Sequence, residues 1–171
     1  MRSRISAARL AGTAMLVAMA LAAQYLESLL PPLVPGVPVK LGLANVFTLF
    51  AFLRLGRADA LIVSVLRALL FLLVTGAVSG GVYALCGTAL GFIAMALLFP
   101  LVKREKLSAP GLSVAGAFFF NAGQALAGYA VVGNAMLYYL TPMGLLSVPA
   151  GLITGFLASE LNRRLPKAAR S

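Results

Sequence analysis

The chain has 171 residues, of which 61% are hydrophobic and 11% are charged. Soluble domains are about half apolar and about a quarter charged, so a soluble chain of this composition would lack the polar surface to cover itself. One cysteine and no histidine exclude an internal disulfide and a metal site built from His and Cys ligands.

Apolar runs of membrane-spanning length follow one another along the chain. A crossing helix needs about 20 apolar residues, and we predict six of them, over residues 9–30, 38–55, 58–78, 82–102, 111–132 and 137–161. The second run is the shortest because its apolar core lies between Lys40 and Arg54, so it crosses only by borrowing flanking residues. The glycine-rich stretch 75–81 is typical of a turn. The sequence therefore predicts one all-α domain, a bundle of six transmembrane helices over residues 1–171.

The basic residues predict the orientation of this bundle. All but two of the 14 lysines and arginines precede the first helix, lie in the second and fourth connections, or follow the last helix. Six crossings put these segments on one side, and an excess of Lys and Arg marks the cytoplasmic side. We therefore expect a bacterial cytoplasmic-membrane protein with both termini in the cytoplasm. The clusters lack interleaved aromatics, so nucleic acid is not an expected partner despite the net charge of +10.

A cleaved signal peptide is an alternative interpretation of the first apolar segment. Arg2 and Arg4, an apolar stretch and the small residues 20–23 have the order of such a peptide. The apolar segment nevertheless continues through Leu26 and Leu30, which favours a retained helix.

Arg67 is the strongest candidate for a functional residue. It lies about ten residues from the cytoplasmic end of the third helix, which is a depth of roughly 15 Å. A guanidinium at that depth is costly unless it pairs with an acid, with carbonyl groups or with an anionic ligand. Glu27, near the outer end of the first helix, is the possible acidic partner. Two interpretations stay open, namely a tie from Arg67 to protein acceptors that locks the bundle, and a contact to a ligand.

Two pairs of polar residues repeat the three-residue spacing that places side chains on one helix face. Gln24 and Glu27 form one pair, and Asn121 and Gln124 form the other. Side-chain amides commonly form hydrogen bonds between transmembrane helices, and each such bond stabilises the helix pair by about 1 kcal/mol. The other interpretation is that they line a polar cavity together with Arg67.

Lys40 and Asn45 flank the start of the second helix. The N-terminal end of a helix carries partial positive charge and free N–H groups. Together with Lys40 it would attract an anion on the outer face, whereas the simpler interpretation is that Lys40 anchors the helix at the membrane interface.

Small residues recur at four-residue spacing in the first helix, as Ala7 and Ala11, and as Ala14 and Ala18. Such spacing allows another helix to approach closely. These residues are candidates for docking a partner helix, although packing within the chain explains them equally well.

Several catalytic arrangements are missing from the sequence. There is no P-loop motif for nucleotide hydrolysis, and the absence of histidine rules out a Ser/His/Asp triad. Asp59 is the only aspartate, so clustered carboxylates for magnesium and diphosphate are missing. We therefore expect neither independent catalysis, nor a metal site, nor a cofactor.

Four stretches resemble one known family. The segment Val37-Pro38-Val39-Lys40-Leu41-Gly42-Leu43-Ala44-Asn45-Val46-Phe47-Thr48-Leu49 resembles the signature of the Gx transporter family, which is also described as heptaprenyl diphosphate synthase component I. Residues 66–70, 121–124 and 138–140 extend the resemblance over most of the chain. The Lys40–Asn45 motif is the most specific of these.

The family is similar in size and helix layout to the substrate-binding S-components of energy-coupling-factor transporters. This resemblance implies a membrane subunit that binds a small molecule near its outer face and works with a coupling subunit and two ATPases. The expected ligand is a small, anionic molecule similar to a vitamin or to a prenyl or quinone precursor. Its expected contacts are Lys40, Asn45, Arg67, Asn121 and Gln124.

Two further hypotheses remain. In one, the chain is a non-catalytic accessory component of a soluble prenyl diphosphate synthase, which docks through basic loop residues such as Lys103, Arg104 and Lys106. In the other, it is a purely structural subunit of a membrane complex without a small-molecule ligand.

Overall fold

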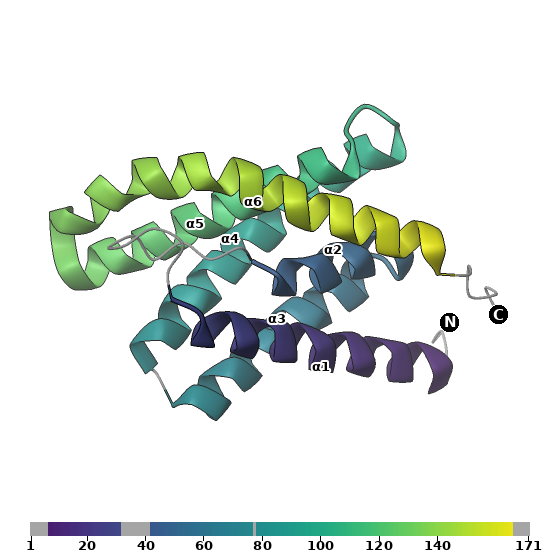
Figure 1. Cartoon of the computed structure of the whole chain (residues 1–171), viewed down its shortest axis with the longest axis horizontal. Coiled ribbons are helices and arrows are strands. Elements are labelled where there is room, and N and C mark those ends of the chain that lie inside the picture. Colours follow the sequence, from purple (N-terminus) through teal and green to yellow (C-terminus); the bar gives the residue numbers. More distant parts are fainter. Residues whose placement is uncertain (1–6, 32–41, 77, 166–171) are drawn as a thin grey trace.

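The computed structural model describes residues 7–31, 42–76 and 78–165, and these residues contain helices and no strands. The helices are α1 (Ala7–Leu29), α2 (Ala44–Arg54), α3 (Arg57–Thr75), α4 (Val78–Lys103), α5 (Ala109–Val132) and α6 (Leu137–Arg164). A short 3-10 helix, η1 (Gly133–Met136), joins α5 to α6. The chain passes back and forth, so that α1 begins and α6 ends at the same end of the bundle (Figure 1).

Five of these helices are long and apolar enough to cross a membrane, and α2 is the exception. The predicted second span, 38–55, is therefore wrong in extent: α2 has 11 residues, which is roughly 16 Å at the helical rise per residue. Gly42 adopts a left-handed φ of +72°, so the helix begins only after it. Residues 38–41 of the predicted span lie outside the described residues.

The connection between α3 and α4 is shorter than the predicted turn over residues 75–81. Gly76 ends α3 in the left-handed conformation, with φ of +62°, and its N–H donates to the carbonyl of Leu72. A glycine in this position satisfies an end carbonyl without a Cβ clash. The helix α4 then begins at Val78, so residues 79–81 are helical rather than part of the turn.

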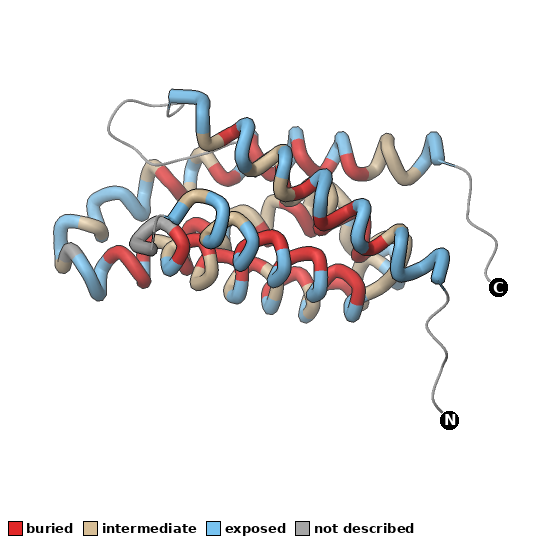
Figure 2. Tube along the Cα trace, turned by 90° about the horizontal axis from the view of Figure 1, so that it is seen from below, coloured by how far each residue is buried: buried red, intermediate tan, exposed pale blue. Residues whose placement is uncertain are grey.

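The six helices pack as two linked groups. Helix α5 lies between α4 and α6, while α1 packs against α2 and α3. The short α2 is central, because it contacts α1, α3 and α6, and the apolar core gathers around it. Buried positions face inward and exposed positions face outward along the helices (Figure 2). The exposed positions include many large apolar side chains, such as Leu73, Leu97 and Val131, as expected where lipid rather than water is the solvent.

Close packing in the group formed by α4, α5 and α6 depends on glycine. A Cβ added at Gly151 would lie 2.5 Å from the Cα of Val114, and one at Gly155 would lie 2.5 Å from the Cα of Pro110. On the other side of α5, a Cβ at Gly123 would lie 2.5 Å from the backbone oxygen of Cys86. Glycines let the helix backbones touch here, as they do in close transmembrane crossings.

The small residues of α1 have a different environment. Ala7, Ala11, Ala14 and Ala18 are all exposed, and a Cβ added at Gly12 would meet nothing within 4 Å. Packing within the described part of the chain therefore does not account for the four-residue spacing in α1.

A buried carboxylate joins α1 to α3 near the chain termini. Asp59 is 5% exposed and accepts hydrogen bonds from the guanidinium of Arg9 and from the hydroxyl of Thr13, the latter at 3.0 Å. The carboxylate is thus satisfied by partners on α1, which fixes the first helix against the third at this end.

We predict that Gly155→Ala destabilises the bundle, because the new methyl group would push α6 away from the backbone of α5. Overpacking of this kind costs about 1–3 kcal/mol. Gly12→Ala is the matched control, since it adds the same group in open space and favours the helix. Thermal unfolding in detergent measures both. A Gly155→Ala protein as stable as the control would contradict the packing described here.

Candidate functional site

A cavity of about 400 Å³ lies between the two groups of helices. Its wall comes from the end of α1, the start of α2, the second half of α3, the first half of α4, and from α5, η1 and α6. These segments lie in the half of the bundle opposite the end where α1 begins and α6 ends. The volume falls in the range of about 300–1,000 Å³ that is usual for small-molecule sites.

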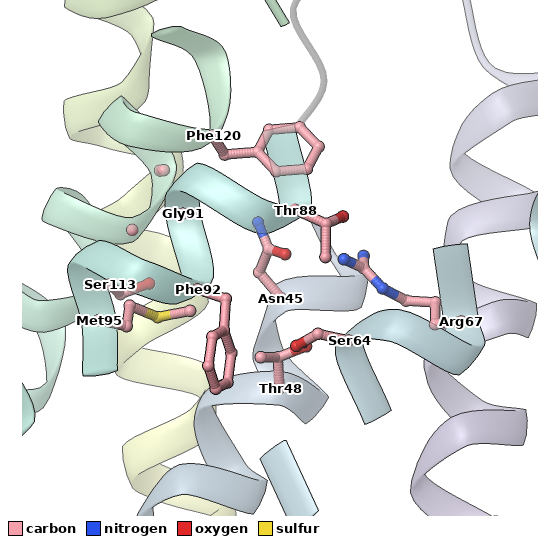
Figure 3. Close-up of a pocket in the computed structure, with 12 residues that line it drawn as sticks. Asn45, Thr48, Ser64, Arg67, Thr88, Gly91, Phe92, Met95, Ser113 and Phe120 are labelled. Carbon is pink, nitrogen blue, oxygen red and sulfur yellow. The ribbon is translucent and has the colours of Figure 1, made fainter. Parts of the chain in front are cut away.

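Arg67 enters the wall of this cavity from α3. The residue is 5% exposed, and no described residue forms a hydrogen bond or an ion pair with its guanidinium. In Figure 3 its side chain points toward Thr88 of α4 and Asn45 of α2. A buried charge without partners is destabilising by several kcal/mol. The position therefore calls for an acceptor that the described protein groups do not supply.

Two further polar atoms in the cavity wall are in the same condition. Gln24 Oε1 on α1 and Thr88 Oγ1 on α4 are buried without a hydrogen-bond partner, as is Nε of Arg67. No other buried side-chain nitrogen or oxygen in the described part of the chain lacks a partner. All three residues line the same cavity. Unsatisfied buried groups are rare in folded proteins, so their convergence on one cavity makes this cavity the candidate binding site.

Glu27 lines the cavity but does not form the predicted ion pair with Arg67. Its carboxylate accepts hydrogen bonds from the backbone N–H groups of Gly42, at 2.6 Å, and Leu43, at 3.1 Å. No described acid lies within 4.0 Å of the Arg67 guanidinium. Glu27 prefers this position because the free N–H groups that precede α2 attract a carboxylate. It thereby ties the end of α1 to the start of α2.

Asn45 is placed by the backbone turn that begins α2. Its N–H donates to the carbonyl of Gly42 at 2.8 Å, and a Cβ at Gly42 would come within 3.0 Å of its side-chain Nδ2. A side chain at position 42 would therefore crowd Asn45 as well as strain the left-handed backbone. Asn45 borders both the cavity and a smaller hollow beneath it.

The two polar residues predicted on α5, Asn121 and Gln124, differ in their contacts. The Nδ2 group of Asn121 donates to the carbonyl of Met143, at 3.1 Å, and to the hydroxyl of Ser147, at 2.8 Å. Asn121 thus ties α5 to α6 while it also lines the cavity. Gln124, one turn further along, lines the cavity as well.

A second, smaller hollow of about 10 Å³ adjoins the main cavity, and Figure 3 shows residues that line it. It shares Asn45, Arg67 and Thr88 with the main cavity and is also lined by Thr48 and Ser64. The hydroxyl of Ser64 donates to the carbonyl of Ala60 at 2.7 Å. The hollow is about the size of one water molecule, so the space for a larger ligand lies in the main cavity.

The structure brings together most of the residues that the sequence predicted for the site. Asn45, Arg67, Asn121 and Gln124 line one cavity, whereas Lys40 lies outside the described residues. Sequence reasoning missed Thr88, because a lone threonine in an apolar helix carries no distinguishing pattern. It also missed the apolar wall, which consists of Phe71, Tyr83, Phe120, Met136 and Met143.

The described residues offer no group of three or more His, Cys, Asp or Glu side chains that could hold a metal ion. The polar groups of the cavity are instead a guanidinium, one carboxylate, side-chain amides and hydroxyls. Such groups are suited to bind and orient a ligand through hydrogen bonds.

Comparison with known proteins gives one match. The model of a family described as heptaprenyl diphosphate synthase component I matches residues 16–161. The search of curated proteins finds no match. The search of solved structures finds none either.

We predict that Glu27→Ala lowers stability, because it removes two charge-assisted hydrogen bonds to the start of α2, each worth about 1.5–3 kcal/mol. Glu105→Ala, the same change at an exposed acid, is the control. Thermal unfolding and hydrogen exchange at residues 42–45 report the effect. Equal stability and equal exchange in the two variants would show that Glu27 does not hold α2 in place.

Proposed function

This chain belongs to the heptaprenyl diphosphate synthase component I family, and we propose that it is a non-catalytic membrane subunit that binds a small, anionic molecule in the cavity. The observation that carries the proposal is Arg67, a buried guanidinium without a described partner that borders a cavity of about 400 Å³. An anionic group placed there would receive charge-assisted hydrogen bonds, which are about twice as strong as neutral ones.

The proposed topology is six passes through a bacterial cytoplasmic membrane with both termini in the cytoplasm. It is supported by the five long apolar helices and by the return direction of the short α2. The exposed basic residues Lys103, Arg104, Lys106, Arg163 and Arg164 favour the cytoplasm for the end of the bundle that holds the termini. The cavity then lies in the outer half of the membrane.

A second candidate role is supported by the family description. In this role the chain is an accessory component of a heptaprenyl diphosphate synthase, and it presents the enzyme with a membrane-bound docking surface. The exposed connection between α4 and α5, with Lys103, Arg104 and Lys106, is the proposed surface. The family description speaks for this role and says nothing of transport.

Translocation of the ligand, as by an S-component of an energy-coupling-factor transporter, is a finer version of the first role. It requires a coupling subunit and ATPases as partners, together with a surface on which they dock. The exposed alanines of α1 are the proposed docking stripe, defined by Ala7, Ala11, Ala14 and Ala18. A stripe of this kind allows close approach by a partner helix.

We predict that Arg67→Met abolishes binding of the small molecule and at the same time stabilises the ligand-free protein. Binding fails because the charged donor is gone. Stability rises because the variant removes a buried charge that lacks a protein partner. Mass spectrometry of small molecules released from the purified protein measures the first effect, and thermal unfolding measures the second.

Arg57→Met is the control for Arg67→Met, because Arg57 is an exposed arginine on the same helix. It should keep both the bound molecule and the stability of the unmodified protein. If Arg67→Met retained the bound molecule, or if it unfolded where Arg57→Met did not, Arg67 would be a structural residue and the proposal would fail.

The two candidate roles predict different partners in a pull-down from native membranes. The accessory role predicts capture of a prenyl diphosphate synthase, lost when Lys103, Arg104 and Lys106 are changed to Glu. The translocation role predicts capture of a coupling subunit with ATPases, lost when Ala11 and Ala18 are changed to Leu. Each variant is the control for the other, and capture that neither variant alters would argue against both surfaces.

A further inference from the structure

The cavity wall carries two opposite charges in its described part. Arg67 is the basic residue and Glu27 is the acidic one among the described lining residues. They lie more than 4.0 Å apart, since no ion pair joins them, yet the two charges attract each other through space. The described wall is therefore polarised, with no net charge, rather than uniformly positive.

The α1 side of the cavity offers hydrogen-bond acceptors. A carboxylate has about four lone-pair sites, and Glu27 uses two of its sites for the backbone N–H groups of Gly42 and Leu43. Gln24 lies on the same face of α1, and its buried Oε1 has no partner. This side of the cavity therefore has spare capacity for an N–H donor, and the negative charge of Glu27 favours a cationic one.

The opposite side offers hydrogen-bond donors. A guanidinium has five N–H donors, and no described group accepts from Arg67. The hydroxyl of Thr88 on α4 lies next to Arg67 (Figure 3), and it is buried without a described hydrogen-bond partner. Phe71 of α3 and Phe120 of α5 supply apolar wall around these groups. Donors and acceptors thus face the same cavity from different helices.

We infer that the ligand is a small zwitterion of the amino-acid type, with a carboxylate against Arg67 and Thr88, an ammonium group against Gln24 and Glu27, and an apolar body against Phe71 and Phe120. This inference rests on the proposed binding role of the cavity; it keeps the anionic group at Arg67 but gives the ligand a balancing ammonium group, so that the whole molecule carries no net charge. Arg67 and Glu27 line the same cavity without forming an ion pair, so a ligand that carries both a carboxylate and an ammonium group has a partner for each. Both ends of the ligand would then be paired within one site.

The same polarity disfavours a prenyl diphosphate as the ligand. A diphosphate brings several negative charges and no N–H donor, so it would leave Gln24 Oε1 without a partner and meet Glu27 as a like charge. Like charges at a binding surface oppose association. The family description names a synthase of such compounds. The ligand inferred for the cavity is therefore a different molecule from the product of that synthase.

Matched pairs of probes test the inference on the full-length protein in detergent. L-phenylalanine and 3-phenylpropionate differ only by the amino group, as do L-leucine and 4-methylpentanoate, and geranyl diphosphate represents the excluded class. Thermal shift and calorimetry measure binding of each. We expect an amino acid to bind about tenfold or more tightly than its matched acid, because a charge-assisted hydrogen bond is at stake.

The variant Gln24→Leu isolates the ammonium site without touching the bonds that Glu27 makes to α2. It should reduce the preference for the amino acid over the matched acid while Glu27 stays in place, whereas Ser28→Ala on the same helix should leave the full preference. Arg67→Met should abolish binding of both members of a pair.

Three results would overturn the inference. In the first, 3-phenylpropionate or geranyl diphosphate binds as tightly as the amino acids and depends on Arg67, which keeps the binding role but rejects the zwitterion. In the second, none of the amino acids binds while the purified protein still releases another small molecule. In the third, no probe binds and no small molecule is released, and the proposed binding role then fails as well.

Discussion

A guanidinium that is buried away from water needs hydrogen-bond acceptors. Arg67 is 5% exposed, and no described residue pairs with its guanidinium or accepts a hydrogen bond from it. Such a residue persists in a fold only where its cost is offset, and intramembrane arginines usually face a cavity or a functional partner. Two other buried polar atoms in the wall of this cavity, Gln24 Oε1 and Thr88 Oγ1, also lack a described partner. Three different helices therefore each present an unsatisfied polar group to the same cavity.

The packing of the bundle explains why the cavity exists. Glycines bring α4, α5 and α6 so close that their backbones touch, and α1 is fixed to α3 through Asp59. The short α2 fills the space between the two groups only in the half of the bundle near the termini, where the apolar core surrounds it. In the other half of the bundle, the cavity lies between the described helices. Glu27 holds the start of α2 at this boundary.

Much of the fold was predictable, because long apolar runs separated by basic clusters leave little choice in a membrane. The length of α2 was not, since hydrophobicity does not reveal that Gly42 adopts a left-handed turn and delays the helix. The burial of Arg67 among other helices was predictable, because a guanidinium so far along an apolar helix cannot face lipid without a large cost. The position of Thr88 in the cavity wall was not predictable. Nor was the finding that Glu27 binds backbone N–H groups instead of Arg67, because both features depend on how helices distant in the sequence pack together.

The binding role, the accessory role and translocation all place the chain in a membrane, as its five long apolar helices indicate. They differ over what occupies the cavity. An experimental structure of the protein, purified without exogenous ligand in a lipid nanodisc, tests this most directly. The account predicts non-protein density in contact with the guanidinium of Arg67. A guanidinium fully hydrogen-bonded by protein groups, or one turned toward lipid, would contradict it.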